Sequence, residues 1–142
     1  MTVAIKRVYE APSPQDGARV LVDRLWPRGL TKEAAALDEW LKDVAPSNEL
    51  RKWFHSHPPQ WSKFREKYLK ELAAETANQA LQQLYEIAKR HRRLTLLYAS
   101  KDEVHNNAAV LKQLLDGDRK PPTGTGPLRA ALARRVRASR PR

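Results

Sequence analysis

The 142-residue sequence contains no cysteine. This absence excludes disulfide bonds, zinc–thiolate sites and thiol nucleophiles, and it fits a reducing compartment. Glycine is scarce, with five residues in the chain. No stretch forms the phosphate-binding loops GxGxxG or GxxxxGK[ST], or the GxSxG turn of α/β hydrolases. The sequence therefore does not predict an ordinary dehydrogenase, a P-loop enzyme or an α/β hydrolase.

Long apolar runs are also missing. The longest, LTLLYA at 94–99, has the length of a strand and falls far short of a membrane span. The first residues, MTVAIKR, lack the charged region followed by an apolar stretch that a signal peptide requires. We therefore expect a cytoplasmic protein that does not associate with membranes.

The formal charge of +11 is unevenly distributed. Residues 117–142 hold eight Arg/Lys and one Asp, whereas residues 1–116 hold nineteen Arg/Lys and fifteen Asp/Glu. The stretch PPTGTGP at 121–127 has the composition of a linker. We expect a mildly basic domain over 1–116 and a flexible basic tail over 117–142, with a short helix at 128–136.

The apolar pattern predicts strands that alternate with helices. Strands are expected at residues 3–9, 19–25, 38–42 and 94–99. Helices are expected at 32–36, from Ser47 to His57, from Thr76 to about residue 90, and after residue 102. Between the second and third of these, the apolar stripe Trp61, Phe64, Tyr68 and Leu72 predicts one more helix. Thr31, Ser47 and Thr76 are the expected N-caps, the last with Gln79 in a capping box. The alternation predicts a single α/β domain with a small, largely parallel sheet of three to four strands flanked by helices.

Ligands of open α/β sheets bind outside the carboxyl ends of the strands. The two best buried strands end in the polar loops 23–29 (DRLWPRG) and 100–107 (SKDEVHNN). Six side chains from these loops are expected on one rim: Arg24, Arg28, Ser100, Lys101, Asp102 and His105. Trp26 lies between the two arginines in the sequence and is expected to form a wall of the site.

A small anionic or nucleotide-like ligand fits these residue types. Arg24, Arg28 and Lys101 would hold the anion, and Ser100 and the amides at the start of the following helix would hydrogen-bond it. Asp102 and His105 are spaced i, i+3, so they share a face if both lie in the first helical turn, where they can act in acid–base chemistry.

Structural roles are the alternative for the same residues. Asp102 can cap the helix, Lys101 can be a solvated loop charge, and Arg24 can pair with Asp23 or Asp102 to hold the loops together. His105 can be a supporting hydrogen-bond partner. The histidines have no specific ligand spacing, so no metal site and no cofactor is predicted. Whether the protein is an enzyme stays open.

Several ordered stretches, among them RVLVDRLWPRG at 19–29, PSNELRKWF at 46–54 and LTLLYASKDEVHNN at 94–107, resemble the YeaO-like proteins, a bacterial family of unknown function. The resemblance covers about residues 3–115. It implies a cytoplasmic, single-domain α/β protein without an established activity. More distant relatives carry cysteines around the second loop, at positions that correspond to Tyr98 and Asn106, so a thiol mechanism cannot operate in this chain.

Two other functions compete with small-ligand binding. The basic tail can bind nucleic acid through phosphate contacts, with little dependence on base sequence. Alternatively, the polar loops can form a protein-interaction surface, in which case replacing Trp26 or Arg28 should abolish recovery of the partner. The sequence does not indicate the oligomeric state.

Overall fold

The structure is a computed structural model, and it describes residues 2–117. Four strands form one sheet: β1 (Thr2–Arg7), β2 (Ala18–Leu21), β3 (Glu39–Trp40) and β4 (Arg93–Tyr98). Their order is β1-β4-β2-β3, and every neighbouring pair is parallel. The predicted single-domain α/β fold with a small parallel sheet is therefore confirmed. Because every pair is parallel, all strand carboxyl ends lie at one edge of the sheet.

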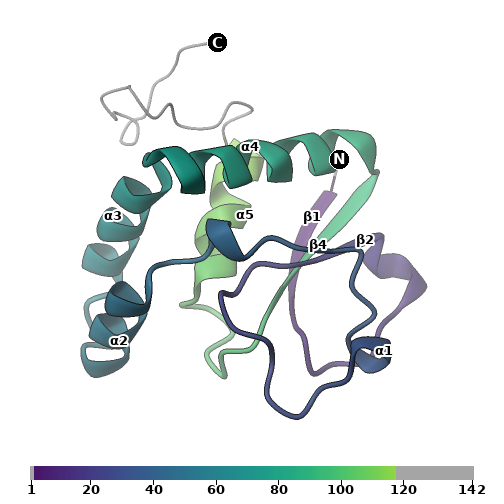
Figure 1. Ribbon diagram of the computed structural model, residues 1–142, viewed down its shortest axis with the longest axis horizontal. Helices are drawn as coiled ribbons and strands as arrows, with labels where there is room; N and C mark the ends of the chain where they lie inside the picture. Colours follow the sequence, from purple (N-terminus) through teal and green to yellow (C-terminus); the bar gives the residue numbers. More distant parts are fainter. Residues whose placement is uncertain (1, 118–142) are drawn as a thin grey trace.

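The helices follow the strands in an uneven pattern. The first connections carry two short turns, η1 (Pro14–Asp16) and η2 (Lys42–Val44), and the short helix α1 (Lys32–Ala35). Three helices then connect β3 to β4: α2 (Asn48–Ser56), α3 (Trp61–Leu72) and α4 (Glu75–Arg90). The last helix, α5 (Asn107–Gly117), follows β4. Figure 1 shows α4 along the amino edge of the sheet, with α2 and α3 to one side of α5.

The sheet has two covered faces, as the continuous apolar centre of residues 19–25 predicts. Val20, Leu94 and Leu96 point to the face under α2–α5 and join the main core. Leu21 and Leu97 point to the opposite face, where a smaller cluster includes Ala35 of α1 and the ring of Trp26. The long connection 22–38 therefore acts as the cover of the second face.

The stripe and the first two caps are confirmed. Ser47 accepts a hydrogen bond from the Leu50 N–H, and Thr31 accepts one from the Ala34 N–H. Phe64, Tyr68 and Leu72 of α3 are all buried. The capping box at Thr76 is wrong, because α4 already begins at Glu75 and no side chain caps it. Only two residues separate α3 from α4, and this short connection fixes the start of the second helix.

The predicted strand ends are too long. β1 ends at Arg7 and β2 at Leu21, whereas the sequence predicted Tyr9 and Leu25. The Val22 N–H still donates to the Leu97 carbonyl, but beyond it the chain turns away from the sheet. The expected tail lies outside the described residues except for Gly117, which is the last residue of α5.

A network of buried charges lies on the second face near the amino edge. Arg19 is 5% exposed and Asp16 is 7% exposed, and their side chains form an ion pair at 2.5 Å. Lys6 also pairs with Asp16, at 3.1 Å, and Arg19 donates to the carbonyls of Ala35 and Ala36. This network ties β1, β2 and the connection after β2 together, so its charges are structural.

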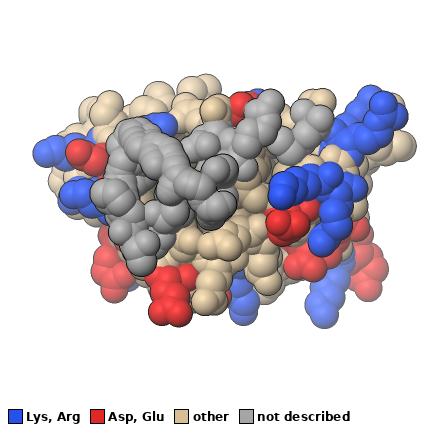
Figure 2. All heavy atoms as spheres, turned by 90° about the horizontal axis from the view of Figure 1, so that it is seen from above, with Lys and Arg blue, Asp and Glu red and all other residues tan. Residues whose placement is uncertain are grey.

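Figure 2 looks onto the amino edge of the sheet and shows how its charged side chains are distributed. Lys and Arg side chains gather on its right-hand side, with Asp and Glu side chains beside them. The last turn of α4 and the start of β4, residues 89–93, contribute Lys89, Arg90, Arg92 and Arg93 to this edge, all of them exposed.

Candidate functional site at the carboxyl edge

Asp23 lies at the centre of the carboxyl edge, two residues after the end of β2. Its carboxylate accepts a hydrogen bond from the Ala99 N–H at 2.9 Å, which links the ends of β2 and β4. The side chain of Asn107, the first residue of α5, hydrogen-bonds the same carboxylate and donates to the Val22 carbonyl at 2.7 Å. Trp40 of β3 donates its indole N–H to the Asp23 carbonyl at 2.7 Å. Asp23 therefore joins three strands and a helix.

The environment of Asp23 makes its carboxyl harder to ionise than a carboxyl in water. Burial raises the pKa of this carboxyl, and the hydrogen bonds from Ala99 and Asn107 and the charge of Arg51 only partly offset that effect. The pKa of Asp23 therefore lies above its ordinary value. Arg51, an exposed residue of α2, influences the carboxylate without a direct ion pair within 4.0 Å.

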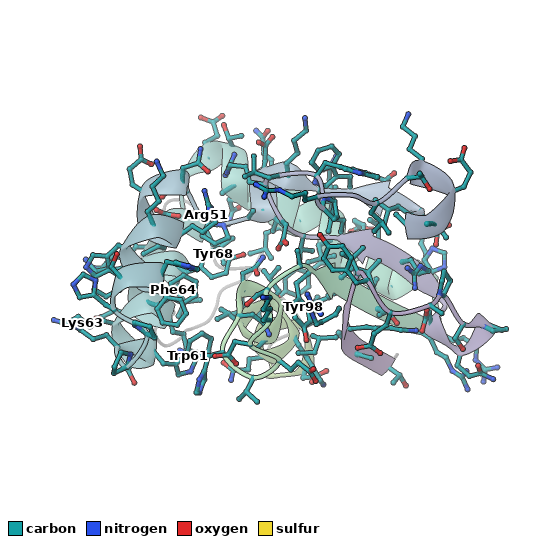
Figure 3. The ribbon with its side chains drawn as sticks, turned by 90° about the horizontal axis from the view of Figure 1, so that it is seen from below. Arg51, Trp61, Lys63, Phe64, Tyr68 and Tyr98 are labelled. Atoms are coloured by element: carbon teal, nitrogen blue, oxygen red, sulfur yellow. The ribbon has the colours of Figure 1, made fainter. Side chains whose placement is uncertain are left out.

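Arg51 belongs to a wall that α2 and α3 form beside the carboxyl edge. Figure 3 looks onto this edge and shows Arg51, Tyr68, Phe64 and Trp61 on the side that faces α5 and Tyr98. Tyr68 is fully buried and donates its hydroxyl to the Val44 carbonyl at 2.5 Å, and burial raises its pKa well above the ordinary value. Tyr68 therefore helps to hold α3 in place beside the edge, whereas the Arg51 side chain is open to solvent.

Arg24 holds two segments together. Its Nε and one terminal nitrogen donate to the carbonyls of Pro46 and Ala45, at 3.2 and 3.0 Å. Its other terminal nitrogen lies 3.9 Å from an Asp43 carboxylate oxygen, and the Arg24 side chain is 33% exposed. The alternative that Arg24 pairs with Asp23 or Asp102 is therefore wrong, because the guanidinium instead satisfies carbonyls that precede α2.

Trp26 packs over the second face of the sheet, and Arg28 follows it in the same connection. The Trp26 ring packs edge-on against Trp40, with ring centroids 5.4 Å apart, and its N–H donates to the Leu30 carbonyl. The Arg28 side chain is exposed, and its backbone carbonyl accepts a hydrogen bond from the Tyr9 hydroxyl at 2.9 Å. Trp26 therefore has a packing role that the sequence did not predict.

The side chains of Arg7 and Tyr9 connect the two predicted loops. The Arg7 guanidinium lies over the Tyr9 ring, 5.1 Å from its centroid. The same guanidinium donates to the carbonyls of Ala99 and Ser100, at 3.0 and 2.9 Å. Since Tyr9 also bonds the Arg28 carbonyl, the end of β1 links loop 23–29 to loop 100–107.

Loop 100–107 brings Ser100, Lys101, Asp102 and His105 together, but not on a helix. Because α5 begins at Asn107, Asp102 and His105 do not lie in its first turn, so the condition for their sharing a helical face is not met. Asp102 instead closes a turn, in which its Oδ1 accepts the N–H groups of Val104 and His105 at 2.9 and 2.8 Å. Its other oxygen lies 3.7 Å from the His105 Nδ1.

These bonds determine the charge state of Asp102. The hydrogen bonds from the backbone N–H groups of His105 and Val104 hold its pKa below the ordinary value, and burial opposes this only weakly. The carboxylate is therefore firmly ionised at neutral pH. The His105 ring packs at a tilt against the Trp61 ring of α3, with the ring centroids 4.9 Å apart. Loop 100–107 therefore contacts the α2–α3 wall.

The amino end of α5 is already capped from within. Asn106 accepts the N–H of Ala109 through its side chain at 2.9 Å and donates to the Asp102 carbonyl. Asn106, and not Asp102, is thus the cap of this helix. The side chains of Asp102 and Asn106 accept hydrogen bonds from the backbone N–H groups of Val104, His105 and Ala109. The sequence predicted that N–H groups here would bind the anion, but these three already have partners.

The comparisons with known proteins identify the family. The family described as "Inactive DUF488-N3 subclade" matches residues 2–124. The chain belongs to it. The uncharacterized protein YeaO of Escherichia coli is 49% identical over 115 residues, which cover 81% of this chain and 97% of YeaO. The predicted YeaO-like domain of unknown function is therefore confirmed.

Other relatives share the same extent of similarity. The uncharacterized protein Rv3073c of Mycobacterium tuberculosis and its counterpart Mb3100c of Mycobacterium bovis are both 43% identical over 115 residues, 81% of this chain and 94% of theirs. No solved structure matches the chain.

Within residues 2–117, no three His, Asp or Glu side chains come together as a metal-binding group. In that same range, no helix combines the length and the apolar character that crossing a membrane requires.

Proposed function

We propose that the protein binds a small anionic, nucleotide-like ligand at the carboxyl edge of its sheet, between loop 100–107 and the wall of α2 and α3. The observation that carries the proposal is that the charge of the exposed Arg51 acts on the partly buried carboxyl of Asp23. Functional sites are where perturbed carboxyl pKa values cluster, and ligands of α/β proteins bind at the carboxyl ends of the strands, where Asp23 lies. A solvent-exposed guanidinium close to it can hold an anion.

The two groups define the ligand chemistry. Arg51 supplies a planar fork of donors for a phosphate or carboxylate. Asp23 offers a partly buried carboxyl that can exchange a hydrogen bond with an amine, amide or hydroxyl of the same ligand. A nucleotide carries both kinds of group. Lys101, exposed at the tip of loop 100–107, would add a second positive charge, and Ser100 beside it would add a hydroxyl.

The remaining predicted residues take narrower roles in this proposal. Arg24 has donated two of its N–H groups to carbonyls, so it would act mainly by positioning α2 and its Arg51. Arg28 would hold loop 23–29 to the segment after β1, since its backbone carbonyl accepts a hydrogen bond from the Tyr9 hydroxyl. Trp26 would support that loop by packing and would not contact the ligand.

Binding has more support than catalysis. The lowered pKa of Asp102 makes its carboxylate a weak proton acceptor at neutral pH, which disfavours acid–base work with His105. The family is described as an inactive subclade. Asp102 would therefore shape the loop, and His105 would rest on Trp61 at the rim of the site.

The test is calorimetric titration of the full chain with adenosine monophosphate and, separately, with inorganic phosphate. Arg51→Ala and Lys101→Ala should each weaken binding about tenfold, the loss expected for one charge-assisted hydrogen bond. Lys70→Ala, which removes an exposed charge from the last turn of α3, should leave the affinity unchanged. Equal affinity in all four proteins would remove Arg51 and Lys101 from the site.

A protein-interaction surface is the second candidate, because three large apolar side chains are exposed in the segments that follow strands β1, β2 and β4. They are Tyr9, Leu25 and Val104, with exposed fractions of 41%, 57% and 67%. Affinity capture with the intact protein would recover a partner that Leu25→Ser loses and Lys70→Ala keeps. Identical captures with both variants would count against this surface.

A further inference from the structure

Tyr98, the last residue of β4, is buried where that strand reaches the carboxyl edge. The residue is 2% exposed, and it belongs to the main core together with Leu94 and Leu96 of the same strand. Figure 3 shows Tyr98 beside α5, across from the wall of α2 and α3. Tyr98 therefore lies at the inner boundary of the site proposed for the ligand.

The hydroxyl of Tyr98 differs from the other tyrosine hydroxyls of the chain. Each of the other three donates to a backbone carbonyl: Tyr9 to Arg28, Tyr68 to Val44 and Tyr85 to Leu114. Within residues 2–117, no group forms a hydrogen bond with the Tyr98 hydroxyl. A buried hydroxyl without a partner destabilises a fold, and phenylalanine would fill the same space without that cost. The packing of the core therefore does not account for this hydroxyl.

The surroundings of Tyr98 determine which ligand group its hydroxyl can bind. Burial raises the pKa of this hydroxyl, the carboxylates of Glu103 and Glu10 raise it further, and the charge of Arg7 opposes them. The hydroxyl is therefore a neutral hydrogen-bond donor at neutral pH. The same carboxylates would repel a phosphate group placed beside it. A neutral acceptor fits this position better than an anion does.

We propose that the Tyr98 hydroxyl binds the neutral, polar end of the ligand, whereas Arg51 and Lys101 hold its anionic end. This inference rests on the proposed function, because it concerns the same site. In a nucleotide, the neutral end is the nucleoside, whose ring nitrogens and sugar hydroxyls accept a hydrogen bond from a phenol. Tyr98 thereby makes the site prefer a nucleoside phosphate over phosphate alone.

The experiment compares wild type with Tyr98→Phe, both as the full chain, by calorimetric titration with adenosine monophosphate and, separately, with inorganic phosphate. Tyr98→Phe should weaken binding of adenosine monophosphate about fivefold, the loss expected for one hydrogen bond between neutral groups. The affinity for inorganic phosphate should stay unchanged, because Tyr98 does not contact the anionic end. Since the variant loses no partner within the fold, its melting temperature should equal or exceed that of wild type.

Tyr85→Phe is the matched control, because it makes the same chemical change in α4, away from the carboxyl edge. The Tyr85 hydroxyl donates to the Leu114 carbonyl at 3.2 Å, and the variant leaves that carbonyl without this bond. Tyr85→Phe should therefore lower the melting temperature and bind adenosine monophosphate as wild type does. The two variants thus separate a hydroxyl that serves the ligand from one that serves the fold.

The results also separate this inference from the proposed function. If Tyr98→Phe binds adenosine monophosphate as wild type does while Arg51→Ala binds it more weakly, the ligand site stands and the role of Tyr98 is overturned. That role is equally overturned if Tyr98→Phe weakens both ligands to the same extent, or if it melts as far below wild type as Tyr85→Phe does. If the wild type binds neither ligand, the proposed function fails and this inference fails with it.

Discussion

The carboxylate of Asp23 accepts a hydrogen bond from the backbone N–H of Ala99, 76 residues away in the sequence, at 2.9 Å. This bond joins the ends of the two central strands, β2 and β4, and places a partly buried acid between them. Asn107 hydrogen-bonds the same acid from the first turn of α5. The centre of the carboxyl edge is thus organised around one carboxyl group.

Asp23→Asn should leave the protein as stable as wild type, or more stable, at neutral pH. The folded pKa of Asp23 is raised, so the ionised carboxylate opposes folding, and stability is lost as pH rises through that pKa. The amide keeps an oxygen that can accept the Ala99 N–H. Urea unfolding from about pH 4 to about pH 7 should show the variant gaining on wild type as pH rises. A widening deficit of the variant over that range would contradict the assignment.

Asp16→Asn should have the opposite effect. Burial raises the pKa of Asp16, but the hydrogen bonds from the Ser13 N–H, Lys6 and Arg19 outweigh it, so the net pKa is lowered. Its stabilisation is therefore present above the unfolded pKa and is lost as pH falls through the folded one. Leaving Arg19 buried without its partner should cost about 3 kcal/mol at neutral pH. Urea midpoints that match those of wild type would show that the network is dispensable.

Gly17→Ala should destabilise the fold by at least about 2 kcal/mol. Gly17 has φ of +65°, and a Cβ there would lie 2.3 Å from the Arg93 carbonyl oxygen. Gly29 has φ of +79° but nothing within 4 Å of an added Cβ, so Gly29→Ala should cost only about 1 kcal/mol of backbone strain. Chemical denaturation of the two variants side by side measures the difference. Equal losses would mean that the close approach to Arg93 does not matter.

Asp102→Ala should loosen loop 100–107 without unfolding the domain. The variant loses the two bonds from the N–H groups of Val104 and His105. At about 1 kcal/mol for such a turn, amide exchange of these residues should accelerate roughly fivefold. Glu103→Ala, a change at the neighbouring exposed carboxylate, serves as the control. Unchanged exchange in Asp102→Ala would argue against the turn.

Local patterns predicted the elements whose ends are determined by their own residues. Ser47 marks the start of α2 because its side chain satisfies a free N–H of that helix. The spacing of Trp61, Phe64, Tyr68 and Leu72 predicted α3 because those positions share one helical face. The Thr76 prediction was wrong, since the two-residue connection after α3 determines where α4 begins.

The site depends on contacts that no local pattern contains. Arg51 looks like any solvated charge on α2, and only the packing of α2 beside the carboxyl edge brings its charge near Asp23. Arg24 was predicted to bind an anion, but carbonyls 21 and 22 positions later occupy its donors. The polar carboxyl-edge loops could be located from the sequence. Which of their side chains hold the fold and which stay free for a ligand depends on tertiary contacts.

Native mass spectrometry of the full chain, purified gently from its own cells, tests the ligand site most directly. Wild type should carry a bound small mass, and Arg51→Ala and Lys101→Ala should both lack it, while Lys70→Ala retains it. A mass that persists in both site variants, or a wild type that carries none, would contradict a small-ligand site at the carboxyl edge.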